Sequence, residues 1–116
     1  MMRWRFVLAL SLLLAIPQAW ADEFVAGTED VPLMPGLKLV TGSDLVFDKP
    51  EGRIVEAQAQ GALSRVKVQA FYAASLPQLG WKKIGADQWQ REAERLKLDF
   101  RGQDGHLTVG FTLSPQ

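Results

Sequence analysis

Apolar and polar residues alternate along the last third of the chain, which is the pattern of half-buried β-strands. Residues 95–101 carry an apolar side chain at every second position, and residues 106–113 repeat this alternation. Gly102-Gln103-Asp104-Gly105 lies between them and has the composition of a hairpin turn. Shorter strand segments at 81–84 and 88–92 come before them. The pattern predicts an antiparallel meander of three or four strands.

The preceding part of the chain predicts a hairpin followed by one helix. Residues 44–47 and 53–60 are strand segments, and between them Pro50 fixes φ while Gly52 permits a positive φ. A short strand at 37–40 can precede them. Ser64 has the residue type of a helix N-cap. After it, apolar residues recur at helical spacing over about four turns, at Val66, Ala70, Phe71, Ala74, Leu76 and Leu79.

This helix is expected to end within the segment Leu76-Pro77-Gln78-Leu79-Gly80-Trp81. Gly80 suits the left-handed position after a helix, and Leu76 and Trp81 are then the pair that touches in a Schellman cap. Pro77 removes one helical hydrogen bond, so either the last turn is kinked or the helix proper stops near Ser75. In both cases Trp81 enters the core as the next strand begins.

Together these elements predict an α+β fold in the order β-β-α-β-β-β. A single helix on an antiparallel sheet of about five strands buries its apolar face most simply in a two-layer arrangement. The opposite face of the sheet is then open to solvent. We expect the face toward the helix to carry Ile54, Trp81 or Ile84, Trp89, Leu96, Leu98, Phe100, Leu107, Val109 and Phe111.

The N-terminal end has the features of an export signal. Arg3 and Arg5 precede an apolar run at 6–16, and Ala19-Trp20-Ala21 has the small-x-small form of a signal-peptidase site. The run is shorter than the about 20 residues that cross a bilayer, so we expect a cleaved signal and no stable membrane anchor. The expected organisation is a signal peptide at 1–21, an extended arm or loop at 22–36 that packs along the domain, and a single α+β domain at 37–116.

The residue types limit the chemistry that we expect. The chain has no cysteine, and its single histidine is too few for a zinc site. No serine lies in a nucleophile elbow, and no glycine-rich phosphate loop is present. Glu92 and Glu94 lie between two arginines, which favours a charged hairpin tip over a glycosidase pair. We therefore expect no catalytic residues, no metal site and no cofactor, and hence a protein that is not an enzyme.

One predicted surface has a distinct composition. Alternation that sends Leu96 and Leu98 inward sends basic side chains outward, and the next strand adds threonines beside them. Such a face is either simply solvated or a docking face for an anionic or polar partner. It carries no aromatic residue, which argues against nucleic acid. With Tyr72, expected at the rim of the helix with a free hydroxyl, the candidate interaction residues are Tyr72, Arg95, Lys97, Arg101, Thr108 and Thr112.

Several phrases of the chain resemble a known pattern. They are Phe71-Tyr72 followed by Leu76-Pro77-x-Leu79-Gly80-Trp81, Phe47-Asp48, Gly52-Arg53-Ile54, and Phe111-x-Leu113-x-Pro115. They are similar to those of a group of small exported proteins of Gram-negative bacteria that have no assigned function. A weaker likeness is to the helix-grip domains of lipoprotein subunits of the outer-membrane β-barrel assembly machinery, whose lipidation cysteine this chain lacks.

Two functional hypotheses follow from the sequence. The first is a non-catalytic, periplasmic or secreted interaction module of the cell envelope that binds an envelope protein and no nucleic acid. The second is a small-ligand-binding protein or small enzyme that uses the crevice between helix and sheet. An edge strand of a small open sheet could also pair with a second copy of the chain.

Overall fold

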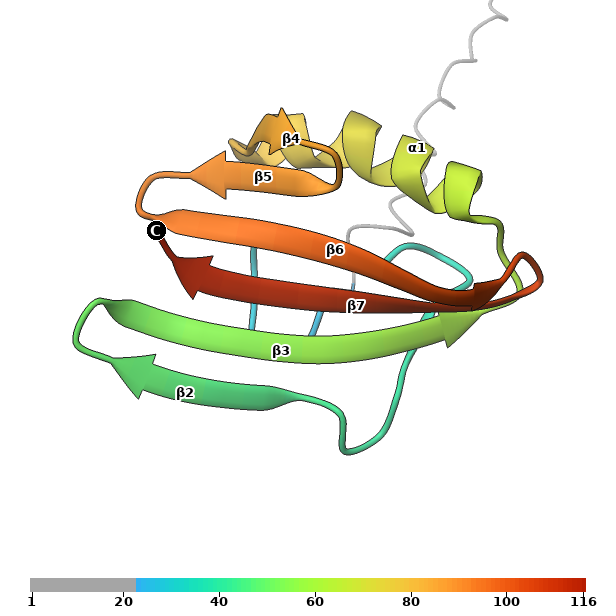
Figure 1. Cartoon of the computed structure of the whole chain (residues 1–116), viewed down its shortest axis with the longest axis horizontal. Coiled ribbons are helices and arrows are strands. Elements are labelled where there is room, and N and C mark those ends of the chain that lie inside the picture. Colours follow the sequence, from blue (N-terminus) through green and yellow to red (C-terminus); the bar gives the residue numbers. More distant parts are fainter. Residues whose placement is uncertain (1–22) are drawn as a thin grey trace, which may run out of the picture.

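The two alternating segments near the C-terminus form the long hairpin at the centre of the sheet (Figure 1). In the computed structural model, which describes residues 23–116, strands β6 (Glu94–Gln103) and β7 (His106–Pro115) pair along their whole length. Strands β5 (Gln88–Arg91) and β4 (Lys82–Gly85) extend the sheet beyond β6. The expected signal peptide at 1–21 lies outside the described residues.

The other side of the sheet is built on β3 (Gly52–Gly61), which pairs with β7. The outer edge of β3 is shared by β2 (Leu45–Lys49) and the short β1 (Lys38–Leu39). The result is one antiparallel, seven-stranded sheet in the order β1-β3-β7-β6-β5-β4, with β2 also on β3. The predicted α+β class is confirmed. The expected number of about five strands was too low, because short segments of two to five residues at both edges also join the sheet.

The helix begins and ends as the sequence indicates. In α1 (Arg65–Ser75) the Ser64 hydroxyl accepts a hydrogen bond from the Lys67 N–H at 3.2 Å, as an N-cap does. The α-helix stops at Ser75 and continues as the 3-10 helix η2 (Leu76–Leu79). Gly80 follows with φ 93°, and the Trp81 N–H bonds to the Leu76 carbonyl at 3.1 Å. This is the Schellman geometry, and the helix proper ends before Pro77.

The buried face of α1 differs from the expected one. Val68, Tyr72 and Ser75 are buried, whereas Val66, expected on the core side, is 72% exposed. The alanines at helical spacing predicted a buried face that is rotated about the helix axis from the face that is buried. The helix turns its largest ring, Tyr72, into the core instead, because a large ring gains more by burial than alanines do. None of the described helices has the length and apolarity to cross a bilayer.

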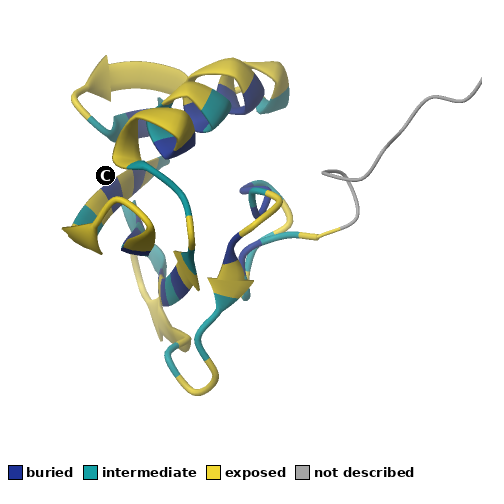
Figure 2. Ribbon diagram, turned by 90° about the vertical axis from the view of Figure 1, so that its right-hand side faces the viewer, coloured by how far each residue is buried: buried dark blue, intermediate teal, exposed yellow. Residues whose placement is uncertain are grey.

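Residues 23–36 form a second cover beside the helix. This arm runs behind the strands in Figure 1, and Figure 2 shows it lying against the sheet below the helix. Its apolar side chains at Val25, Val31 and Leu33 are buried in the same core as the helix. One face of the sheet is therefore covered by two elements, the helix over one half and the arm over the other.

The inner face of the sheet is that predicted from β6 and β7, with one correction and one open alternative now decided. Val55, Ala57 and Ala59 of β3 point inward, so Ile54, expected inside, lies on the opposite face. Trp81 is buried and Ile84 is 45% exposed, which decides between the two alternatives. Ile54 was assigned to the inner face because it is the most apolar residue of β3. It shares its side of the strand with Glu56, Gln58 and Gln60, and this polar alternation indicates the outer face.

Candidate functional site

The outer face of the sheet, opposite the helix and the arm, brings together five of the six predicted interaction residues. Lys97 lies directly across from Thr112, and Arg101 from Thr108, on the β6–β7 pair. Arg95 is two residues before Lys97 and faces the same way. Figure 1 looks onto this face, and none of the described helices or loops lies in front of its central strands.

Neighbouring strands enlarge this outer face with residues that the sequence analysis did not include. Lys38 of β1 pairs with Gln60, and Lys82 of β4 pairs with Gln90, so both lysines belong to it. Lys49 of β2 pairs with Gly52, which lies on the same side of β3 as Glu56, so it belongs to this face as well. The face then carries six cations and two carboxylates among the described residues: Lys38, Lys49, Lys82, Arg95, Lys97 and Arg101 against Glu56 and Asp99. For Glu56 the missed signal was the polar alternation in β3, which the inward placement of Ile54 obscured.

The charges on the outer face are loosely held. Its Arg101–Asp99 pair has a separation of 4.0 Å between Nε and Oδ1, and both side chains are about half exposed. An exposed pair of this kind contributes little, about 0–1 kcal/mol. The Asp99 carboxylate lies over Gly110 of the next strand, where a Cβ atom would come within 2.7 Å of its oxygens. The basic side chains of the face are thus available to a partner.

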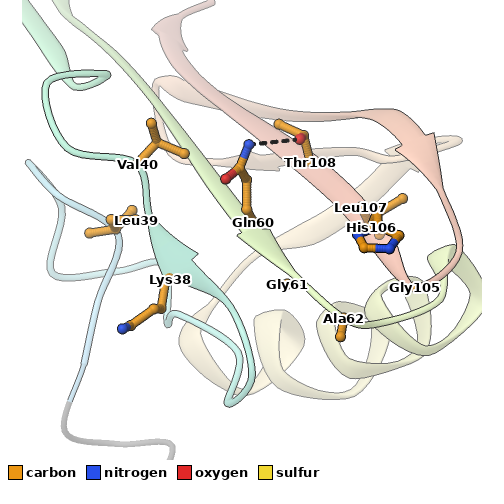
Figure 3. A pocket seen from close by; sticks show the side chains of 10 residues that line it. All are labelled: Lys38, Leu39, Val40, Gln60, Gly61, Ala62, Gly105, His106, Leu107 and Thr108. Atoms are coloured by element: carbon orange, nitrogen blue, oxygen red, sulfur yellow. Dashed lines mark hydrogen bonds between the residues drawn. The ribbon is translucent and has the colours of Figure 1, made fainter.

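A hollow of about 520 Å³ lies at the β1 end of the outer face (Figure 3). It is bounded by the start of β7 and by the end of β3, where the Gln60 side-chain amide donates to the Thr108 hydroxyl at 3.4 Å. The polar groups at its rim are an ammonium, an amide, a hydroxyl and an imidazole, from Lys38, Gln60, Thr108 and His106. These groups can donate hydrogen bonds to an anionic or polar group of a partner.

Tyr72 does not belong to this surface, which corrects the expectation of a free hydroxyl at the rim. The side chain is 1% exposed. Its hydroxyl donates to the Pro32 carbonyl at 2.7 Å and accepts from the Met34 N–H at 3.3 Å. The ring packs edge-on against Phe71 and Phe111. Tyr72 therefore joins the helix, the arm and the sheet, and its burial raises the pKa of the hydroxyl above its usual value.

Tyr72→Phe is expected to lower the free energy of unfolding at neutral pH by about 1–2 kcal/mol, because it leaves two arm backbone groups without their partner. The raised pKa adds a second effect with a definite sign. The folded protein holds the phenol proton while the unfolded chain releases it above pH 10, so the wild type loses stability as the pH rises beyond that value. Denaturant unfolding at pH 8 to 11 measures both effects.

The Phe variant serves as the control for every other contribution to the pH dependence of stability. Its stability should fall less steeply above pH 10, by up to about 1.4 kcal/mol per pH unit. Because Tyr72 is the chain's single tyrosine, tyrosinate absorbance reports on it alone. Parallel pH profiles for the two proteins, or a native hydroxyl that titrates at the ordinary value, would contradict this role.

The crevice between helix and sheet is largely filled. Trp81, Trp89 and Leu98 are buried within it. A hollow of about 340 Å³ remains at its margin, near the turn between β4 and β5. There the Gln69 amide donates to the Asp87 carboxylate at 3.0 Å, and the Arg65 guanidinium lies 3.8 Å from it. The polar groups at this margin therefore already have partners within the domain.

A cluster of charged side chains binds the arm to the edge of the sheet. The Asp30 carboxylate lies 2.8 Å from the Arg91 guanidinium and 3.8 Å from that of Arg53, which also contacts Glu94 at 3.2 Å. Arg91 further donates to the Leu79 carbonyl at 2.9 Å and lies over the Trp81 ring. Glu94, expected at a solvated hairpin tip, is instead part of this cluster. The cluster holds the arm in place and leaves the outer face free.

Comparison of the chain with protein-family models, with curated protein sequences and with solved structures finds no match.

Proposed function

We propose that this protein is a non-catalytic interaction module of the cell envelope that docks an acidic envelope protein on its outer sheet face. The observation that carries the proposal is the excess of six cations over two carboxylates on a broad face that no described helix or arm covers. Clustered charge of one sign speeds association with an oppositely charged partner and excludes partners of like charge. The export signal expected from the sequence places this partner in the periplasm or outside the cell.

The polar groups of the outer face favour binding over catalysis. Most of them are hydrogen-bond donors and cations, and no nucleophile and base are paired among the described side chains of this face. The packing of Trp81 and Trp89 in the helix–sheet crevice favours this module over a small-ligand binder. The marginal hollow beside Asp87 is the place that a ligand-binding alternative would have to use.

In-cell photo-crosslinking from the outer face tests the proposal. A crosslinkable residue at Lys97 or Thr108 is expected to capture the same acidic protein, identified by mass spectrometry. The matched control position is Val66, which is 72% exposed on the helix side and should capture none of it. Capture of no specific protein from the two sheet positions, or equal capture from Val66, would refute the docking face.

Charge reversal adds a quantitative measurement to the same experiment. Lys97→Glu should reduce capture from Thr108 several-fold, because it removes an attractive charge and adds a repulsive one. Lys67→Glu makes the same change on an exposed helix position and should leave capture unaltered. Equal losses in the two variants would show that only net charge matters and that this face is not the site.

A further inference from the structure

The two edges of the sheet differ in how they are protected from pairing. Edge strands are commonly blunted by lysines and by bulges. β4 has both, with Lys82 and Lys83 in sequence and a register shift before Gly85. β2 has no register shift, and its one lysine, Lys49, lies at the turn end of the strand. The remaining run of Leu45, Val46 and Phe47 has side chains that are 46%, 52% and 49% exposed. β2 therefore presents an exposed apolar run along the edge of the sheet.

The pairing of β2 with β3 determines which backbone groups of β2 point away from the sheet. Lys49 and Gly52 pair across a turn of two residues, so they exchange both hydrogen bonds. Alternation along the ladder then makes Phe47 and Leu45 hydrogen-bonded to β3, and it directs the N–H and C=O groups of Val46 and Asp48 outward. Among residues 23–116 no other backbone group bonds to these outward groups.

We propose that β2 pairs with the β2 strand of a second copy of this chain, antiparallel and centred on Phe47. In this register Val46 of each copy lies opposite Asp48 of the other, so the outward groups of the two residues bond to each other reciprocally. Phe47 faces its own counterpart in a non-hydrogen-bonded pair, where the side chains come closest. The expected partner is a second copy, because its β2 strand supplies backbone groups and apolar side chains that match those of the first copy.

Charge selects this register over its neighbours. A shift that centres the pair on Val46 sets Asp44 opposite Asp48, and one that centres it on Asp48 sets two aspartates opposite each other. The Phe47-centred register places no like charges directly opposite and uses all five residues of the strand. The contact between the two β2 strands is small for a stable interface, so the dimer should be weak and concentration-dependent.

The dimer would enlarge the outer face, although the proposed docking does not depend on it. A two-fold axis through the Phe47 pair, perpendicular to the sheet, keeps the outer faces of both copies on the same side. The cationic surface would be doubled without any new residue. Self-association and partner docking remain separable, because the first depends on β2 and the second on β6 and β7.

Cysteine substitution tests the register directly, because the chain contains no other thiol. Residues opposite each other in a non-hydrogen-bonded pair have Cα atoms about 4.5 Å apart, which is within the range that a disulfide accepts. The full chain with Phe47→Cys is expected to form a covalent dimer on mild oxidation that reduction reverses. Val46→Cys, whose side chain lies on the opposite face of the strand, should form no covalent dimer. Absence of the Phe47→Cys dimer, or equal dimer from Val46→Cys, would overturn the proposed pairing.

Sedimentation velocity of the full wild-type chain and of variants that contain no cysteine provides a second measurement. The wild type should show a concentration-dependent shift from monomer to dimer. Phe47→Asp should weaken self-association about tenfold or more, since it removes the aromatic pair and opposes two carboxylates. Ile84→Asp is the matched control, 45% exposed on the other edge, and should leave it unchanged. A wild type that stays monomeric up to millimolar concentration, or equal effects of the two variants, would overturn the proposal.

Discussion

Trp81→Ala is expected to lower the free energy of unfolding by about 3–5 kcal/mol, the cost typical of removing a large aromatic side chain from a core. The ring is 2% exposed and packs where the arm, η2 and the sheet meet. Its Nε1–H donates to the Asp30 carbonyl at 3.0 Å, and the Arg91 guanidinium lies 5.3 Å from the ring centroid. The substitution therefore leaves a cavity and also releases one anchor of the arm. Denaturant unfolding followed by circular dichroism measures the loss.

Trp81→Phe separates the two contributions. It retains most of the ring volume but has no N–H, so it should cost far less than alanine while still leaving the Asp30 carbonyl without its partner. Proteolysis of the arm should increase in both variants, because both lose that hydrogen bond. A loss below about 1 kcal/mol for Trp81→Ala would contradict the placement of this ring in the core.

Gly80→Val is expected to lower the free energy of unfolding by about 2–3 kcal/mol, because a β-branched residue is forced into a left-handed backbone conformation. Gly80 has φ 93° at the end of η2, and its conformation permits the two hydrogen bonds that close the helix. A Cβ atom here would also lie 3.2 Å from the Cδ of Arg91, the residue that binds Asp30. Thermal and denaturant unfolding measure the effect.

Gly42→Val is the matched control for this strain. Gly42 has φ 79°, and a Cβ atom there would meet no heavy atom within 4 Å. Its loss of stability should therefore be smaller, since it adds backbone strain without crowding a neighbour and lies outside the helix cap. Gly80→Asn should be tolerated better than valine, because asparagine adopts the left-handed conformation more readily. Unchanged stability of Gly80→Val would contradict the cap.

The candidate site was predictable where a strand alternates cleanly. In β6 the phase of Leu96 and Leu98 places Arg95, Lys97 and Arg101 on one face without further information. The partner strand β7 follows from the same rule. In β3 a single large apolar residue, Ile54, conflicted with the polar alternation that comes after it, and the phase was misread. Lys38 and Lys82 lie on strands of two and four residues, too short for a pattern to show their phase.

The sequence alone determined the local features of this protein, because each depends on a few neighbouring residues. These are the strand hairpin β6–β7, the Ser64 N-cap and the Gly80–Trp81 helix end. Only the tertiary structure decided which side of α1 is buried and where the arm lies, because both depend on contacts between segments distant in the chain. Tyr72 illustrates the difference: its hydroxyl is bound 40 residues away, by the Pro32 carbonyl. That long-range contact turns a residue expected on the surface into one that holds the core together.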